Sequence, residues 1–164
     1  MRSRRRPSAS SRRRRFASSS QRNRLPERRP GWGGAELTAP HVWITLGYRS
    51  VEHGDGEAVI EWDAPVEYCF QGSSGPIVHG GLVTTLLDTA MGGACHSLLD
   101  RGETFLTADL HAEFLRPTRP GTLRATGRVV HRTKRMVFCA AELHDGDGNH
   151  LASARCTQVL LPER

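Results

Sequence analysis

The sequence predicts an α+β domain in which an antiparallel sheet wraps around one long central helix. Residues 80–99 are the one segment whose apolar residues recur convincingly at helical spacing. Residues 104–161 instead alternate between apolar and polar residues, as strands with one buried face do. The predicted elements follow the order β-β-α-β-β-β-β, and a sheet that curls around the single helix buries its apolar side completely.

Two strands and a long loop are predicted before the helix. Residues 42–51 are rich in Val, Trp, Ile, Thr and Tyr, which favour strands. The His-Gly-Asp-Gly segment at residues 53–56 predicts a hairpin turn, because glycine supplies the positive φ that such turns need, and residues 58–62 form the returning strand. Residues 63–79 contain two prolines and two glycines and are expected to be a long irregular loop, a kind of segment that is often functional.

The predicted helix has one broad apolar side and an opposite side of small and polar residues. The apolar side carries Leu82, Val83, Leu86, Leu87, Ala90, Met91 and Ala94, and the other side carries Gly81, Thr84, Asp88, Gly92 and Cys95. The Gly92-Gly93 pair weakens a helix by about 1 kcal/mol per glycine relative to alanine. That destabilisation suggests that a substrate or another subunit approaches the helix closely there.

Four strands are predicted after the helix, with turn-forming Pro, Gly and Asp residues between them. They span about residues 104–116, 121–133, 135–145 and 149–161. The short connections predict an antiparallel meander. A sheet of this kind leaves edge strands, so pairing between subunits is expected.

Positive charge is concentrated near the N-terminus. Residues 1–30 hold 12 of the 23 lysine and arginine residues and one acidic residue, so their net charge is +11, and the other residues carry −5 of the chain's total of +6. We therefore divide the chain into an Arg- and Ser-rich tail, residues 1–35, which is predicted to be disordered, and a domain, residues 36–164.

The tail leaves four interpretations open. It could be an upstream extension that is not normally translated, a solvated segment without function, a transit peptide, or a segment that binds RNA or another polyanion. Any nucleic-acid binding would therefore rest on the tail alone. We expect a cytoplasmic protein, or a mitochondrial matrix protein if the tail is a transit peptide.

Composition and motifs exclude several classes of protein. No apolar run approaches the roughly 20 residues of a membrane-spanning helix. The four cysteines form no C-x-x-C pair and have apolar neighbours, which indicates reduced thiols in the core and no zinc site. No phosphate-binding loop, dinucleotide motif or metal-ligand set is found in the sequence, so no cofactor is expected.

A motif at the start of the predicted helix resembles that of a known enzyme family. Residues 70–95, FQGSSGPIVHGGLVTTLLDTAMGGAC, resemble the signature of the PaaI-like branch of hotdog-fold thioesterases, within the 4-hydroxybenzoyl-CoA thioesterase superfamily. In that branch six residues separate His-Gly-Gly from Asp-x-Ala, as they separate His79-Gly80-Gly81 from Asp88-Thr89-Ala90 here. The similarity covers roughly residues 42–161. It implies a hotdog fold, hydrolysis of an acyl-CoA to a free acid and CoA, and a homodimer or a dimer of dimers.

Gly80 and Asp88 would carry the central chemistry. The first N–H groups of a helix have no partner within it and carry partial positive charge, so Gly80 and Gly81 could form an oxyanion site. By resemblance, the Gly80 N–H donates to the thioester oxygen. Asp88 lies two turns further along and would be either the general base for water or the direct nucleophile. Its alternative interpretation is a solvated helix position without a catalytic role.

Further candidate catalytic residues surround the motif. His79 would position the helix start and could orient the substrate carbonyl, or could be a structural histidine; no G-x-S-x-G motif makes it part of a triad. Many family members have Asn where this chain has Ser73, and the local Phe-Gln-Gly pattern resembles a sub-branch in which Gln71 would position water or the carbonyl. Thr107 matches a family hydroxyl residue expected to assist the acid across the subunit interface, or is an ordinary strand threonine.

The remaining candidates are expected to bind the substrate. Gly81, Thr84 and Ser73 lie close in sequence to the catalytic candidates. The turn over residues 131–135 is the densest positive segment outside the tail, and its Arg132, Lys134 and Arg135 are expected to contact CoA phosphates. The alternative is a solvated hairpin tip whose charges protect a sheet edge.

Two other kinds of function compete with hydrolysis. A hotdog dehydratase or isomerase would need a catalytic histidine with a differently spaced acid, which is not found. A non-catalytic acyl-CoA-binding or polyanion-binding protein would make Asp88 dispensable, and salt-sensitive binding that is lost on deleting residues 1–30 would support it.

Overall fold

The computed structural model describes residues 40–161, so the tail predicted over residues 1–35 lies outside the described residues. The elements are α1 (His41–Leu46), β1 (Tyr48–Gly54), β2 (Glu57–Ala64), a 3-10 turn (Val66–Tyr68), β3 (Cys69–Gly72), β4 (Gly75–Val78), α2 (Gly80–His96), β5 (Thr104–Phe114), β6 (Gly121–Arg132), β7 (Met136–Asp145) and β8 (His150–Leu161). Within this range no helix is both long and apolar enough to cross a membrane.

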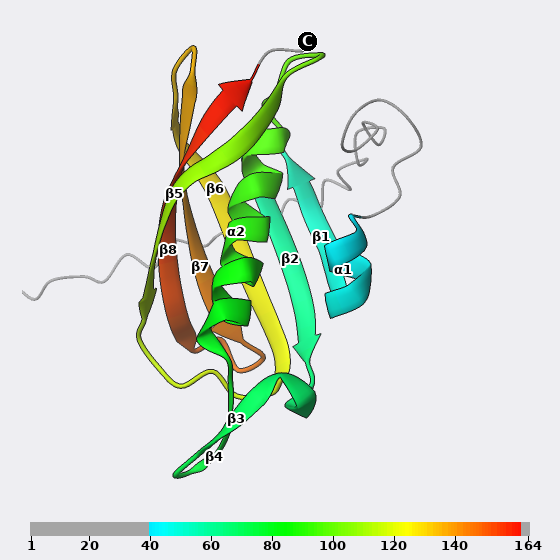
Figure 1. The fold of residues 1–164 in the computed structure, drawn as a ribbon, viewed down its shortest axis with the longest axis vertical. Helices are drawn as coiled ribbons and strands as arrows, with labels where there is room; N and C mark the ends of the chain where they lie inside the picture. The colour runs from blue at the N-terminus through cyan, green and yellow to red at the C-terminus, as the bar shows by residue number, and fades with distance from the viewer. Residues whose placement is uncertain (1–39, 162–164) are drawn as a thin grey trace, which may run out of the picture.

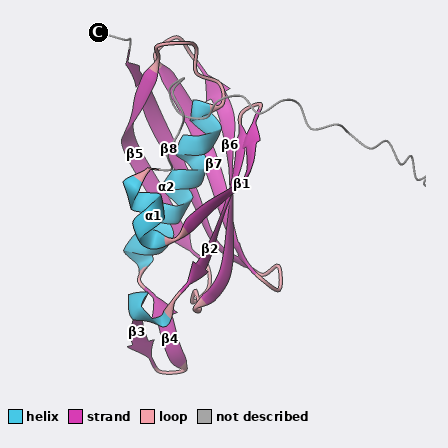
Figure 2. Ribbon diagram, turned by 90° about the vertical axis from the view of Figure 1, so that its right-hand side faces the viewer, coloured by secondary structure: helices cyan, strands magenta, loops and turns pink. Residues whose placement is uncertain are grey.

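A six-stranded sheet curves around α2 (Figure 1). Its strand order is β1-β2-β6-β7-β8-β5, and every neighbouring pair is antiparallel. In the view turned by 90°, both helices lie on one side of the sheet (Figure 2). The predicted α+β architecture, an antiparallel sheet wrapped around one central helix, is confirmed.

The connectivity differs from the predicted meander at one strand. β6, β7 and β8 pair in sequence order, as predicted. β5, however, pairs with β8 rather than with β6, because residues 115–120 carry the chain from one side of the sheet to the other. β6 pairs instead with β2. β5 is therefore an edge strand of the sheet in this chain.

The prediction of a strand over residues 42–51 was wrong for its first half, which forms α1. The carbonyl of Pro40 accepts from the N–H of Trp43 at 2.8 Å, which closes the first turn of the helix. Gly47, with φ of 78°, then ends the helix in the left-handed region and donates to the Trp43 carbonyl. These local hydrogen bonds outweigh the strand preference of the side chains, and the strand begins only at Tyr48.

The long loop predicted over residues 63–79 contains a short hairpin instead. β3 and β4 pair around the two-residue turn Ser73-Ser74, with Gly72 opposite Gly75. The hairpin projects beyond the sheet at the end where α2 begins (Figure 1). It therefore lies beside the start of α2 that carries the motif.

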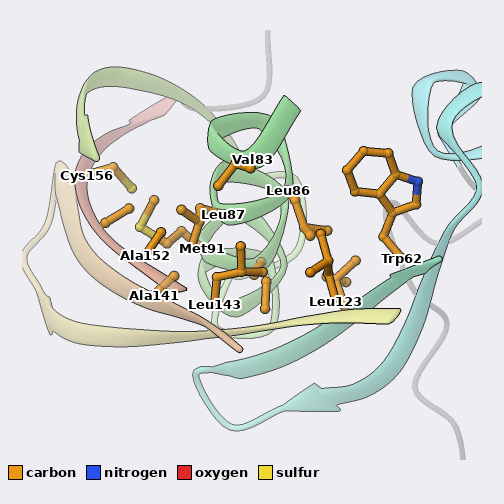
Figure 3. Close-up of a cluster of buried hydrophobic side chains, with 14 of the residues drawn as sticks. Trp62, Val83, Leu86, Leu87, Met91, Leu123, Ala141, Leu143, Ala152 and Cys156 are labelled. Carbon is orange, nitrogen blue, oxygen red and sulfur yellow. The ribbon is translucent and has the colours of Figure 1, made fainter. Parts of the chain in front are cut away.

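The core forms between α2 and the concave face of the sheet (Figure 3). Six of the seven predicted apolar residues of α2 are buried, and Leu82 is partly exposed. Trp62, Leu123 and Leu143 pack against them from three different strands. Burial of each such large side chain contributes about 1.5–3 kcal/mol. Cys95, Cys139 and Cys156 are buried thiols without disulfides, as predicted.

The close approach predicted at the glycine pair of α2 comes from strands of the same chain. A Cβ at Gly93 would lie 2.9 Å from the Cβ of Ala58 on β2. A Cβ at Gly92 would lie 3.4 Å from the ring of Phe105 on β5. The chain's own sheet therefore accounts for Gly93, where the sequence suggested a substrate or a second subunit, whereas a methyl group at Gly92 would make an ordinary contact.

Candidate active site

The start of α2 is capped by the side chain of His79. Its Nδ1 accepts a hydrogen bond from the Gly81 N–H at 3.0 Å, while its own backbone N–H donates to the Tyr68 carbonyl at 2.9 Å. Nδ1 can accept only when it carries no proton, so a neutral ring carries its proton on Nε2. The cap is a structural contact of His79, and the orientation of the substrate carbonyl by its ring stays a prediction.

One backbone donor remains available at the helix start. The Gly81 N–H is used by His79, whereas the Gly80 N–H makes no hydrogen bond within residues 40–161. Because it also lies at the positive end of the helix dipole, Gly80 is the better placed of the two glycines to bind a developing negative charge.

An apolar pocket of about 350 Å³ adjoins Gly80. The rings of Phe70 and Phe114 and the side chain of Val83 line it, and a Cβ on Gly80 would lie 3.3 Å from the Phe114 ring. Phe70 and Phe114 are largely exposed in this chain. Sequence analysis did not single out these two rings, because an exposed aromatic residue has no distinctive spacing.

Asp88 makes a direct hydrogen bond with Thr107. The Thr107 hydroxyl donates to Oδ1 of Asp88 at 3.1 Å, joining the middle of α2 to the edge strand β5. Burial raises the pKa of the Asp88 carboxyl, and the Thr107 hydrogen bond partly offsets that rise. A carboxylate with a raised pKa is a stronger base than an ordinary aspartate, as general-base work requires.

A β-bulge aims Thr107 at the helix. Thr107 pairs with Gln158 and Asp109 pairs with Thr157, so Ala108 between them has no partner on β8. In a regular strand, residues three positions apart face opposite sides of the sheet. The inserted residue allows both Thr107 and Leu110, three positions later, to face α2. Bulges are frequent next to active sites for this reason.

The Asp88–Thr107 contact lies within one chain, whereas the sequence analysis expected Thr107 to act across a subunit interface. Gly80 and Asp88, by contrast, are separated by eight residues of α2. At about 1.5 Å per residue this is about 12 Å along the helix axis, too far for both to act on one carbonyl group. Gly80 and Asp88, which were expected to carry the central chemistry, therefore do not meet within one chain.

Of three other candidates, two have local partners. Thr84 donates to the Gly80 carbonyl at 2.9 Å, and Gln71 donates to the Gly72 carbonyl at 3.3 Å. Gln71 and Ser73 are exposed on the β3–β4 hairpin, at the Gly80 end of α2. None of the three forms a hydrogen bond with Asp88 in the described part of the chain.

The basic turn divides into one structural and two exposed cations. Arg132 forms an ion pair with Glu103 at 2.6 Å and with Asp100 at 3.2 Å, and it also donates to the Leu98 carbonyl. It thereby ties β6 to the segment that links α2 and β5. Lys134 and Arg135 are exposed, and their side chains form no ion pair with any described residue.

Comparison with known proteins gives the same picture as the geometry. The sequence profile of the Thioesterase superfamily matches residues 75–152. A solved structure of a protein from the thioesterase superfamily is 30% identical, with a TM-score of 0.67, over 74% of this chain and 89% of that one. The PaaI protein of Escherichia coli, from the phenylacetic acid degradation operon, is 26% identical, with a TM-score of 0.67, over 74% of this chain and 85% of that one.

A relative whose name states its activity matches part of the chain. The medium/long-chain acyl-CoA thioesterase YigI of Salmonella typhimurium is 32% identical over 97 residues, which are 51% of this chain and 63% of that protein. The chain spans about three-fifths of the length of the curated relatives it matches. A sheet wrapped around a helix that begins with His-Gly-Gly and carries an aspartate defines a hotdog-fold protein of the thioesterase type. The chain belongs to the thioesterase superfamily.

Proposed function

We propose that the protein hydrolyses an acyl-CoA thioester to a free carboxylic acid and CoA. The observation that carries the proposal is the Asp88–Thr107 pair: a carboxyl of raised pKa, oriented by a hydroxyl at 3.1 Å on the polar side of the central helix. Family membership and the acyl-CoA thioesterase YigI among its relatives support the choice of substrate class.

In the proposed reaction Asp88 acts as a general base. Its carboxylate removes a proton from a water molecule, whose oxygen attacks the thioester carbon. The Gly80 N–H stabilises the oxyanion of the tetrahedral intermediate, which then collapses by expelling the CoA thiolate. Direct attack by Asp88, through an acyl-enzyme anhydride that water hydrolyses, is the alternative within the same site.

We propose that two copies of the chain complete each site. Gly80 and Asp88 of one chain are about 12 Å apart along α2, so one carbonyl group can meet Gly80 of one copy and Asp88 of another. β5 offers a surface for this assembly, because it is an edge strand and Leu106 on it is 62% exposed. A homodimer, alone or paired with a second dimer, satisfies both observations.

The substrate's two ends have different candidate surfaces. The apolar pocket beside Gly80, with Phe70 and Phe114, suits the acyl chain. We assign the CoA phosphates to Lys134 and Arg135, since the Arg132 guanidinium is already paired with Glu103.

Thiol release from a panel of short, long and aromatic acyl-CoAs tests the proposal. Asp88→Asn should lower the rate about 100-fold or more, the scale of a lost general base. Asp147→Asn, at an exposed carboxylate in the turn between β7 and β8, is the matched control and should retain wild-type activity. Equal rates for wild type and Asp88→Asn, or no turnover of any thioester by wild type, would refute the proposal.

A further inference from the structure

Gln158 on β8 is a fully buried polar residue without a partner. Its exposed fraction is 0%. Neither Nε2 nor Oε1 of its side chain has a hydrogen-bond partner among residues 40–161. Buried amides in native proteins almost always have partners, because leaving one unpaired lowers stability. A residue that is kept in this state calls for a functional explanation.

Gln158 lies directly behind the proposed catalytic pair. It is the cross-strand partner of Thr107, whose hydroxyl donates to Asp88. Residues that face each other in this way have Cβ atoms about 4.5–5.5 Å apart. The Gln158 side chain and the Asp88 carboxylate are therefore both neighbours of the Thr107 side chain.

Gly92 leaves the backbone of α2 without a side chain opposite Gln158. A Cβ on Gly92 would lie 3.9 Å from Gln158 Nε2 and 3.4 Å from the ring of Phe105, which are ordinary contact distances. Gly92 follows Asp88 by one helical turn, so both residues lie on the same side of α2. A buried amide without a protein partner is a place where proteins commonly hold an ordered water molecule.

We propose that Gln158 is a positioning residue of the hydrolytic site, which holds one water molecule beside Gly92 that donates a hydrogen bond to Asp88 Oδ2. Thr107 occupies Oδ1, and Oδ2 has no hydrogen-bond partner within the described range. A carboxylate oxygen accepts two hydrogen bonds, so Oδ2 keeps a lone pair for the reacting water. This water bridge between Gln158 and Asp88 orients the carboxylate and favours its charged form. This inference rests on the proposed function of Asp88.

Two variants remove the bridge in different ways. Gln158→Leu removes the amide at similar volume, and Gly92→Ala keeps the amide but places a methyl group beside it. Each should have a melting temperature at or above that of wild type, because Leu removes an unpaired buried amide and Ala favours the helix. Each should nevertheless lower kcat about 10- to 100-fold with little change in KM, the scale of one lost hydrogen bond to a charged group.

The pH dependence gives a readout that a purely structural residue would not move. Loss of a donor to the carboxylate raises its pKa, so the acidic limb of the kcat/KM profile should move to higher pH in both variants. The pKa of Asp88, measured from the ¹³C shift of its carboxyl carbon, should rise in Gln158→Leu even without substrate. Thr157→Val, the neighbouring position on β8, is the control and should leave both quantities unchanged.

The same experiment separates this inference from the proposed function. If Asp88→Asn loses activity but Gln158→Leu and Gly92→Ala keep wild-type kcat and pH limb, the bridge is refuted and the hydrolytic role of Asp88 stands. An unchanged Asp88 pKa in Gln158→Leu also refutes the bridge. If wild type turns over no acyl-CoA, both the function and the inference are overturned.

Discussion

Gly127 on β6 lies against the backbone of α2, and its replacement by alanine tests this packing directly. A Cβ there would lie 2.3 Å from the carbonyl carbon and oxygen of Ala90 and 2.7 Å from the nitrogen of Met91. These are backbone atoms of a helix, so none can rotate away. Ordinary contact begins near 3.5 Å, so β6 and α2 would have to separate by roughly 1 Å.

We expect Gly127→Ala to destabilise the protein by about 3 kcal/mol, the upper end of the range for an overpacked core. For a domain of this size about 4 °C of melting temperature corresponds to each kcal/mol, so the midpoint should fall by about 12 °C. Thermal unfolding followed by circular dichroism measures it. Gly146→Ala is the control, since the nearest atom to its Cβ is the Thr122 carbonyl oxygen at 4.0 Å.

The effect should reach the active site as well. Ala90 is two residues beyond Asp88, so a displaced helix moves Asp88 relative to Thr107. Thiol release by Gly127→Ala at a temperature where it is still folded should therefore be lower than that of Gly146→Ala. A melting midpoint within about 2 °C of the Gly146→Ala variant would refute the packing argument.

Two further predictions concern Thr107 and the basic turn. Burial raises the pKa of Asp88 and Thr107 lowers it, so Thr107→Val should raise this pKa further. Because activity is lost as the pH falls through the raised pKa, the acidic limb of kcat/KM should move to higher pH, and an unmoved limb would contradict the 3.1 Å contact. Arg132→Leu should lower stability by about 1 kcal/mol in a thermal melt, because it breaks the ion pair with the partly exposed Glu103. Arg135→Leu should leave the melting temperature unchanged and raise KM for acyl-CoA, most of all at low salt. If Arg132→Leu instead raised KM and Arg135→Leu lowered the melting temperature, Arg132 would be the substrate-binding residue and Arg135 the structural one.

The sequence predicts those parts of the fold that depend on local periodicity. The apolar stripe of α2 and the alternation in β6 and β7 are repeated many times, so the prediction of each element rests on several residues at once. α1 was missed because its six residues are strand formers, and only the caps at Pro40 and Gly47 reveal the helix. The pairing of β5 with β8 was also missed, since no local sequence pattern indicates which strands are neighbours in the sheet.

For the candidate site, too, the sequence predicts the residues of a local motif but not the contacts between distant segments. Gly80 and Asp88 could be named from a contiguous motif, whose spacing is a property of one helix. The Thr107–Asp88 contact joins residues 19 positions apart through a bulge, and the sequence does not show where a bulge falls. Gln158 could have been noticed as the polar residue between Cys156 and Leu160 in the inward-facing register of β8, but its missing partners are a property of the packed core.

The His79 cap also bears on the choice of leaving group. With the Gly81 N–H held by Nδ1, the helix start presents one amide to a developing oxyanion. A thiol of pKa near 8.5 departs as the anion, whereas the amine of an amide must be protonated before it leaves. A helix start with a single free amide therefore suits the thiolate leaving group of the proposed thioester substrate.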